Sequence, residues 1–117
     1  NIASVAGVTG AAAGAVYTAS KHALVGLSRN TAYTYAPFGI RCNTLIVGGV
    51  DTNIMAGADP ATFDHEALAQ YSKWHAVNPR TLKPVEVAHL VLFLASDEAS
   101  GINGAEVAVD AGWTAAG

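Results

Sequence analysis

The chain has 117 residues, of which 51% are apolar and 13% are charged, and a formal net charge of −3. This length allows one small domain, and the composition is typical of a buried sheet and excludes a disordered chain. The six cationic residues are scattered singly, and the longest apolar run, residues 87–95, is too short to span a bilayer, so we expect neither a nucleic-acid nor a membrane partner. Cys42 is the only cysteine, which excludes an intrachain disulfide and favours a reducing, cytoplasmic setting.

The first half of the chain alternates between extended and helical patterns. Residues 1–6 are expected to form a short buried strand, and residues 7–14 a loop of small residues. A helix is expected over residues 15–35, because small or apolar residues recur there at helical spacing: Val16, Ala19, Ala23 and Leu27. A proline and a glycine end this helix, and residues 40–47 predict a second strand.

The second half begins with a turn-rich loop. Residues 61–76 predict a helix whose buried face would consist of Phe63, Leu68, Tyr71 and Trp74. Pro84 suits the first turn of another helix, where no backbone N–H is needed, and this helix continues to residue 95. Residues 101–104 form a turn, and residues 106–111 form the last strand.

The order of these elements, β-α-β-α-α-β, predicts an α/β fold with parallel strands and helices on both faces of the sheet. About three strands make a narrow sheet. Because parallel sheets are normally buried, we expect the first strand to pair with a further strand that this chain lacks. Asn1 is not a methionine, and the strand pattern begins at this first residue, so we expect the chain to be a piece of a longer protein.

The stretch TGAAAGAVYTASK, residues 9–21, allows two interpretations. Thr9, Gly10 and Gly14 match most of TGxxxGxG, a loop whose glycines let the backbone approach a pyrophosphate at a helix N-terminus. However, Val16 stands in place of the last glycine, and no acidic residue ends a strand about 20 residues further on, where a ribose would need it. The alternative is a loop of small residues that packs closely.

The second half of this stretch places Tyr17 and Lys21 four positions apart, on one face of the helix. A nearby ammonium favours the phenolate form of a tyrosine. Such a tyrosine can take the proton of a hydroxyl group or give one to a carbonyl oxygen. Ser4 lies at the end of the preceding strand, where parallel sheets bind their ligands, and could donate a hydrogen bond to the same substrate oxygen.

Together, Ser4 and Tyr17-Thr-Ala-Ser-Lys21 resemble the active-site signature of the short-chain dehydrogenase/reductase family. GIRCNTLIVGGVDT, residues 39–52, is similar to the family pattern GIRVNxxxPGxxxT, and residues 83–113 are similar to its closing helix, turn and last strand. The resemblance covers the chain from end to end. The general pattern resembles the 3-oxoacyl-[acyl-carrier-protein] reductase-like subgroup.

This resemblance implies the C-terminal half of a Rossmann-type doubly wound parallel sheet, in an oxidoreductase that uses NAD or NADP. Tyr17 would be the general acid/base. Lys21 would favour the phenolate of Tyr17 and hydrogen-bond the nicotinamide ribose, and Ser4 would hold the substrate oxygen. The substrate would be a small carbonyl or alcohol compound, with a 3-oxoacyl thioester as the first candidate, and the protein would be a homodimer or homotetramer.

The resemblance also assigns a cofactor loop. Gly48, Val50 and Thr52 would touch the nicotinamide end, Val50 with its backbone toward the carboxamide and Thr52 with its hydroxyl. Val47 replaces the family proline before Gly48, and since proline fixes φ, we expect a looser loop here.

The N-terminal half that carries the family's own phosphate loop is absent from the sequence, so residues 7–14 would be the loop between Ser4 and Tyr17. The region around residues 55–74 forms a mobile lid over the substrate in this family, although an ordinary amphipathic helix would show the same pattern. The histidines lack paired-ligand spacing, so no metal site is predicted. The alternative for the whole chain is a truncated, inactive remnant that serves only as an oligomerisation or binding module.

Overall fold

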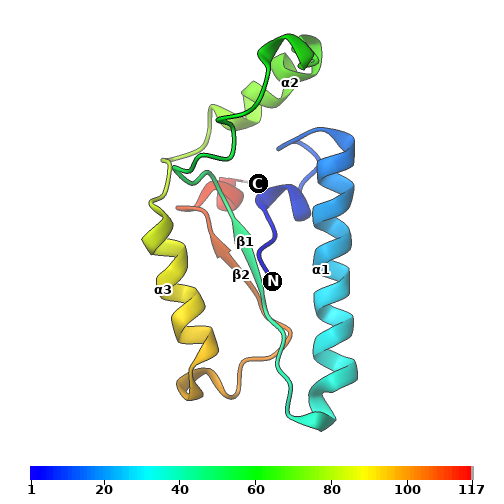
Figure 1. Cartoon of the computed structure of the whole chain (residues 1–117), viewed down its shortest axis with the longest axis vertical. Helices are drawn as coiled ribbons and strands as arrows, with labels where there is room; N and C mark the ends of the chain where they lie inside the picture. The colour runs from blue at the N-terminus through cyan, green and yellow to red at the C-terminus, as the bar shows by residue number, and fades with distance from the viewer. Residues whose placement is uncertain (117) are drawn as a thin grey trace.

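The structure is a computed structural model, and it describes residues 1–116. Its main elements are α1 (Ala15–Tyr35), β1 (Thr44–Val47), α2 (His65–His75), α3 (Pro84–Ala95) and β2 (Glu106–Val109) (Figure 1). Five short 3-10 turns lie within the same residues: η1 (Val5–Gly7), η2 (Ala36–Phe38), η3 (Pro60–Thr62), η4 (Asp97–Ala99) and η5 (Trp113–Ala116).

The sheet consists of β1 and β2, which pair in parallel from Thr44 opposite Glu106 to Val47 opposite Val109. The N-terminal residues 1–3 lie on the other side of β1 and add one isolated parallel bridge, in which the Ala3 N–H donates to the Leu45 carbonyl at 2.9 Å. The prediction of parallel strands is confirmed. The prediction of a strand through residue 6 is wrong, because the chain turns into η1 directly after Ser4.

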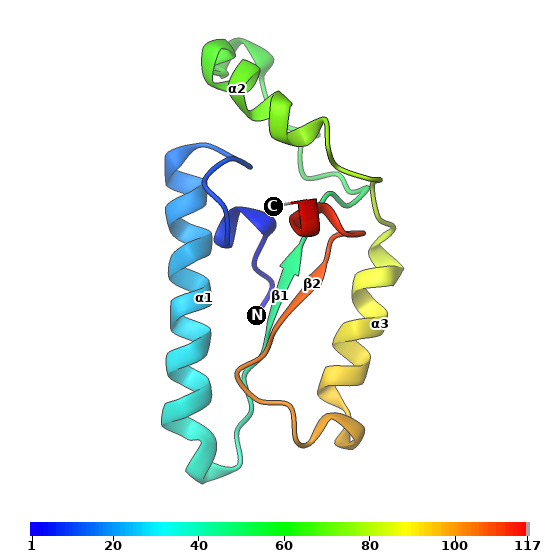
Figure 2. The same ribbon diagram turned by 180° about the vertical axis from the view of Figure 1, so that it is seen from behind.

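Two helices cover opposite faces of this narrow sheet (Figures 1 and 2). Side chains alternate between the faces along a strand. Ile46 accordingly packs into one hydrophobic cluster with Val25 of α1, whereas Leu45 and Val47 pack into another with Leu94 of α3. The expected placement of helices on both faces is confirmed.

The long helix α1 has the predicted bounds, and Gly14 precedes its first residue. Its buried residues are Val25, Ser28 and Ala32, which face the sheet. The residues whose spacing predicted the helix are exposed instead, with Val16 86% and Leu27 58% exposed. The helix therefore presents a second apolar stripe to its surroundings.

The helix α2 differs from the prediction of residues 61–76. It begins only at His65, where the Asp64 carboxylate accepts a hydrogen bond from the Ala67 N–H at 2.9 Å. No residue of α2 is fully buried: Tyr71 and Trp74 are half-buried and Leu68 is exposed, while Phe63 precedes the helix. The prediction of a buried face on this helix is thus wrong, because α2 projects beyond the end of the sheet and does not pack on it (Figure 1).

Both strands are shorter than predicted because polar contacts replace the ladder at their ends. Cys42 precedes β1, and its N–H donates to the side chain of Asn103 rather than to a strand. After β2, Asp110 accepts a hydrogen bond from the Gly112 N–H, and Ala111 has a positive φ of 57°. The chain therefore turns away from the sheet directly after Val109.

Candidate active site

A cavity of about 700 Å³ lies at the carboxyl end of β1. All six residues predicted for catalysis or cofactor binding line it: Ser4, Tyr17, Lys21, Gly48, Val50 and Thr52. They come from three separate segments, namely the N-terminal segment, the start of α1 and the loop after β1. The fold therefore brings the sequence-predicted residues together.

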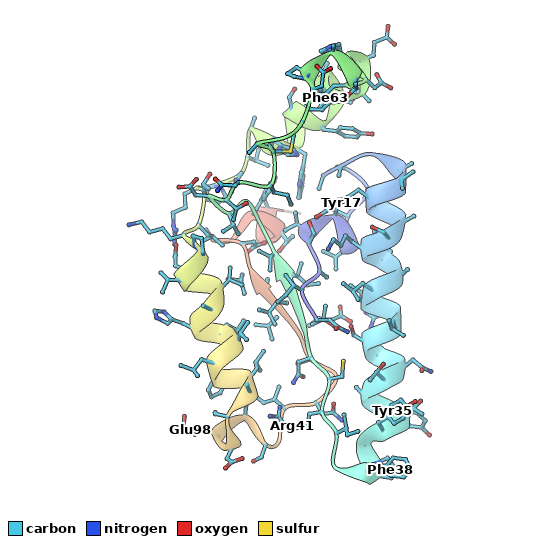
Figure 3. All side chains as sticks on the ribbon, viewed as in Figure 1. Tyr17, Tyr35, Phe38, Arg41, Phe63 and Glu98 are labelled. Atoms are coloured by element: carbon cyan, nitrogen blue, oxygen red, sulfur yellow. The ribbon has the colours of Figure 1, made fainter. Side chains whose placement is uncertain are left out.

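Tyr17 lies near the upper end of α1 (Figure 3). The Lys21 ammonium sits over its ring, 5.4 Å from the ring centroid, as expected for residues four apart on a helix. The same ammonium donates to the Ile2 carbonyl at 3.3 Å and thereby ties α1 to the N-terminal segment. Tyr17 is 43% exposed and lines the cavity, so solvent reaches this residue.

Ser4 is held by the turn that follows it. Its Oγ accepts a hydrogen bond from the Ala6 N–H at 3.1 Å, which leaves the hydroxyl proton free to be donated elsewhere. The turn packs tightly on α1: a Cβ on Gly7 would lie 3.0 Å from the Lys21 carbonyl oxygen. Glycine at this position therefore allows Ser4 to approach the helix that carries Lys21.

The loop after β1 starts at a point where two backbone segments approach closely. Val47 is buried and paired with Val109, and the Gly48 N–H donates to the Val109 carbonyl at 3.0 Å. A Cβ on Gly48 would lie 2.9 Å from the Cα of Asp110. The start of the loop is thus held by the sheet, although the family proline is absent.

Val50 belongs to a short parallel bridge with Leu82. The Asp51 N–H donates to the Leu82 carbonyl at 2.9 Å, and the Leu82 N–H donates to the Gly49 carbonyl at 2.8 Å. Within residues 1–116, the N–H and C=O of Val50 itself have no hydrogen-bond partner. The bridge therefore fixes the backbone on both sides of Val50 and leaves its own polar groups available to a ligand.

Thr52, the last of the six, stands in an exposed turn. Among residues 1–116 its Oγ1 accepts only a long hydrogen bond of 3.4 Å from the Ile54 N–H, and its hydroxyl donates to none of them. Behind the loop, burial raises the pKa of Asp110, but hydrogen bonds from Thr114 and Gly112 outweigh it and hold that pKa below its usual value. Asp110 is thus a carboxylate that anchors η5 behind the cavity.

Sequence reasoning missed several residues at this site. Trp113 of η5 lines the cavity and is 3% exposed, and His75 and Asn78 reach it from the end of α2 and the following loop. His75 Nε2 lies 2.8 Å from the Ala12 carbonyl oxygen. No motif or ligand spacing marks these positions, and the docking of α2 places His75 and Asn78 here.

A second cavity, of about 460 Å³, lies between α2 and the loop before α1. Its lining residues are Ala12, Ala13, Gly14, Leu68, Tyr71, Ser72 and His75. The two cavities share three lining residues, namely Ala12, Ala13 and His75. Residues 12–14, which belong to the glycine-rich part of the stretch with two interpretations, thus form part of a wall, and Ala12 is packed into the core. None of the described helices is long and apolar enough to cross a membrane.

Comparison with known proteins places this geometry in a family. A family model described as enoyl-(acyl carrier protein) reductase matches residues 1–114. The short-chain dehydrogenase/reductase olcF of Penicillium canescens is 49% identical over 97% of this chain and 47% of its own length. The chain therefore belongs to the short-chain dehydrogenase/reductase family.

Solved structures agree. A 4-hydroxyisoleucine dehydrogenase complexed with NADH and succinate is similar with a TM-score of 0.76 and 32% identity, over 98% of this chain and 45% of that chain. A short chain dehydrogenase from Mycobacterium paratuberculosis bound to NAD is similar with a TM-score of 0.79 and 32% identity, over 97% of this chain and 44% of that chain. The predicted family and the Rossmann-type fold are confirmed, and the description of the family model fits the resemblance to acyl-carrier-protein reductases. The chain spans about half the length of the curated relatives it matches.

Proposed function

We propose that this chain carries the catalytic residues of an NAD(P)-dependent oxidoreductase, which transfers a hydride between a nicotinamide and the carbon of a carbonyl or secondary alcohol group. The observation that carries this proposal is the gathering of Ser4, Tyr17 and Lys21 around one cavity at the carboxyl end of β1. In open parallel sheets, this is the end at which ligands bind.

In this proposal Tyr17 moves the proton. During alcohol oxidation, its phenolate oxygen takes the hydroxyl proton while the carbon loses its hydride, and during carbonyl reduction it returns the proton to the oxygen. The Lys21 ammonium beside the ring would stabilise the phenolate through its positive charge. Ser4 would donate its free hydroxyl proton to the substrate oxygen and orient it toward Tyr17.

The loop after β1 fits the amide end of a nicotinamide. A carboxamide offers both donors and an acceptor, and the free N–H and C=O of Val50 offer the complementary pair. Gly48 would allow close approach of the ring, and the Thr52 hydroxyl would add a donor. Lys21 would bind the ribose. The cofactor supplies the hydride, and these residues would orient the nicotinamide. The proposal includes both NAD and NADP.

We further propose that the complete protein contains a second half with the phosphate-binding loop. One edge of residues 1–3 pairs with β1. A further strand of the complete protein would pair with the opposite edge of residues 1–3 and extend the sheet. The 47% coverage of olcF is consistent with this arrangement. The outer stripe of α1, which includes Val16 and Leu27, is an apolar surface of the kind that subunit contacts cover, and it supports a homodimer or homotetramer.

For the substrate, a 3-oxoacyl thioester is the first candidate. The description of the matching family model names an acyl-carrier-protein substrate, which shares the thioester but carries an enoyl group in place of the 3-oxo group. The direct experiment incubates the complete protein with reduced nicotinamide cofactor that carries deuterium at both C4 positions, and with a panel of ketones that includes a 3-oxoacyl thioester. We expect deuterium on the carbinol carbon of at least one product. Failure of label transfer for every ketone, with the cofactor bound, would favour the alternative of an inactive oligomerisation or binding module.

A further inference from the structure

The helix α2 overhangs the candidate active site, and its firmest contacts with the body lie at its last turn. Its first turns project beyond the sheet and are exposed or half-buried (Figures 1 and 2). At its end, the half-buried Trp74 and the exposed His75 meet two segments that are distant in the sequence. The position of this helix over the cavities therefore depends on a small set of side chains.

His75 contacts both segments. Its Nε2 lies 2.8 Å from the carbonyl oxygen of Ala12, a buried residue of the loop before α1. Its ring meets Trp113 edge-on, with centroids 5.3 Å apart and planes at 81°. Trp113 also stacks on Trp74 at 5.8 Å and donates from Nε1 to the Trp74 carbonyl at 3.1 Å. Aromatic contacts and a hydrogen bond thus converge on one turn of helix.

The hydrogen bond to Ala12 lies where the two cavities meet. Ala12, Ala13 and His75 line both the cavity of about 700 Å³ and the cavity of about 460 Å³. The larger cavity holds Ser4 and Tyr17, whereas the smaller one is bounded by α2 itself. If this bond opened, α2 would lose its hydrogen bond to the loop, and its last turn would be held by the contacts of Trp74 and His75 with Trp113.

We propose that His75 is a positioning residue that docks α2 against the loop before α1 and thereby fixes the wall between the two cavities. This inference rests on the proposed function, since the docked helix would define the space for the substrate beside Tyr17. The substrate would bind the docked state, so a smaller docked population raises KM in proportion. At saturating substrate the docked state is restored, and kcat is unchanged.

The test compares three variants of the complete protein. His75→Phe keeps an aromatic ring against Trp113 but removes the donor to Ala12. His75→Gln keeps a side-chain N–H donor. His65→Phe is the matched control, because His65, like His75, is an exposed histidine of α2 but lies at the opposite end of the helix, in its first turn. Hydrogen–deuterium exchange of residues 65–78 measures docking, and α3 serves as the internal reference.

We expect about tenfold faster exchange of α2 in His75→Phe, the change that corresponds to one hydrogen bond, with α3 unchanged. KM should rise by no more than this factor while kcat stays within twofold, and His75→Gln should bring both the exchange rate and KM back toward the unaltered values. Unchanged exchange in His75→Phe would overturn the docking role, whatever the activity. A loss of kcat equal to the loss of kcat/KM would overturn the positioning role. If no ketone is reduced even by the unaltered protein, the proposed function fails, and the exchange measurement still decides whether His75 docks α2.

Discussion

Replacing Gly48 with alanine would place a methyl group at the tightest backbone approach beside the cavity. The new Cβ would lie 2.9 Å from both the Cα and the Cβ of Asp110, and 3.5 Å from Cε3 of Trp113. Carbon atoms in optimal contact are about 3.5–4.0 Å apart, so a gap of roughly 0.6–1.1 Å would have to open. The neighbour is backbone and not the end of a flexible side chain, so it cannot rotate away.

The surroundings resist that opening. The Gly48 N–H is bonded to the Val109 carbonyl at 3.0 Å, and Asp110 accepts hydrogen bonds from Gly112 and Thr114. Overpacking of this kind costs about 1–3 kcal/mol, and the loss of glycine's freedom in the unfolded chain returns about 0.4–1 kcal/mol. We therefore expect Gly48→Ala to reduce the free energy of unfolding by about 1–2 kcal/mol.

Urea denaturation measures this change. With a slope of about 2 kcal/mol/M, in the middle of the usual range for urea, the midpoint should fall by about 0.5–1 M. Gly57→Ala is the matched control, because a Cβ there meets no atom within 4 Å, and it should unfold at or slightly above the unaltered midpoint. A Gly48→Ala protein with the unaltered midpoint and slope would show that the close approach to Asp110 does not exist in solution.

Three further predictions follow from the same geometry. In the complete protein, Lys21→Ala should weaken both cofactor binding and turnover. An unchanged dissociation constant for the cofactor would show that Lys21 does not bind it. Hydrogen bonds from Arg80 hold the pKa of Glu86 at about 2, below its usual 4.5. Its contribution to stability is therefore complete above about pH 4.5 and is lost as the pH falls toward about 2. The difference in urea midpoint between the unaltered protein and Glu86→Gln should shrink over that window, and a difference independent of pH would refute the pairing. Calorimetric titration of NADH and NADPH into the 117-residue chain should show no tight binding. Clear binding that is lost in Gly10→Val with the fold intact would instead make residues 9–14 a nucleotide cradle.

Much of the fold could be predicted from the sequence because local chemistry marks its boundaries. The helix over residues 15–35 lies between a glycine and a proline-containing turn, and Pro84 begins α3 as expected. The active-site residues were predictable for a different reason. Ser4, Tyr17 and Lys21 occur in a motif whose spacing already implies a common helix face and strand end, and the structure brings them to one cavity.

The remaining features depend on contacts that no local pattern encodes. Residues 1–3 form only a bridge, because Ser4 caps a turn where apolar composition predicted a strand. The apolar spacing in α1 predicts a helix but not which side faces the sheet, and Val16 proves to lie outside. His75 could not be recognised at all, since its partner Ala12 is distant in the sequence and is bonded through its backbone.

The most direct test of the account is Tyr17→Phe in the complete protein, measured beside Tyr33→Phe. The two tyrosines share α1, but Tyr33 is 86% exposed and does not line the cavity with Tyr17. Because general acid–base catalysis contributes about 10²–10⁴-fold, Tyr17→Phe should lower kcat by that factor while cofactor affinity is retained, and Tyr33→Phe should behave as the unaltered protein. Turnover by Tyr17→Phe at the unaltered rate would contradict the assignment of this cavity as a hydride-transfer site with Tyr17 as its acid and base.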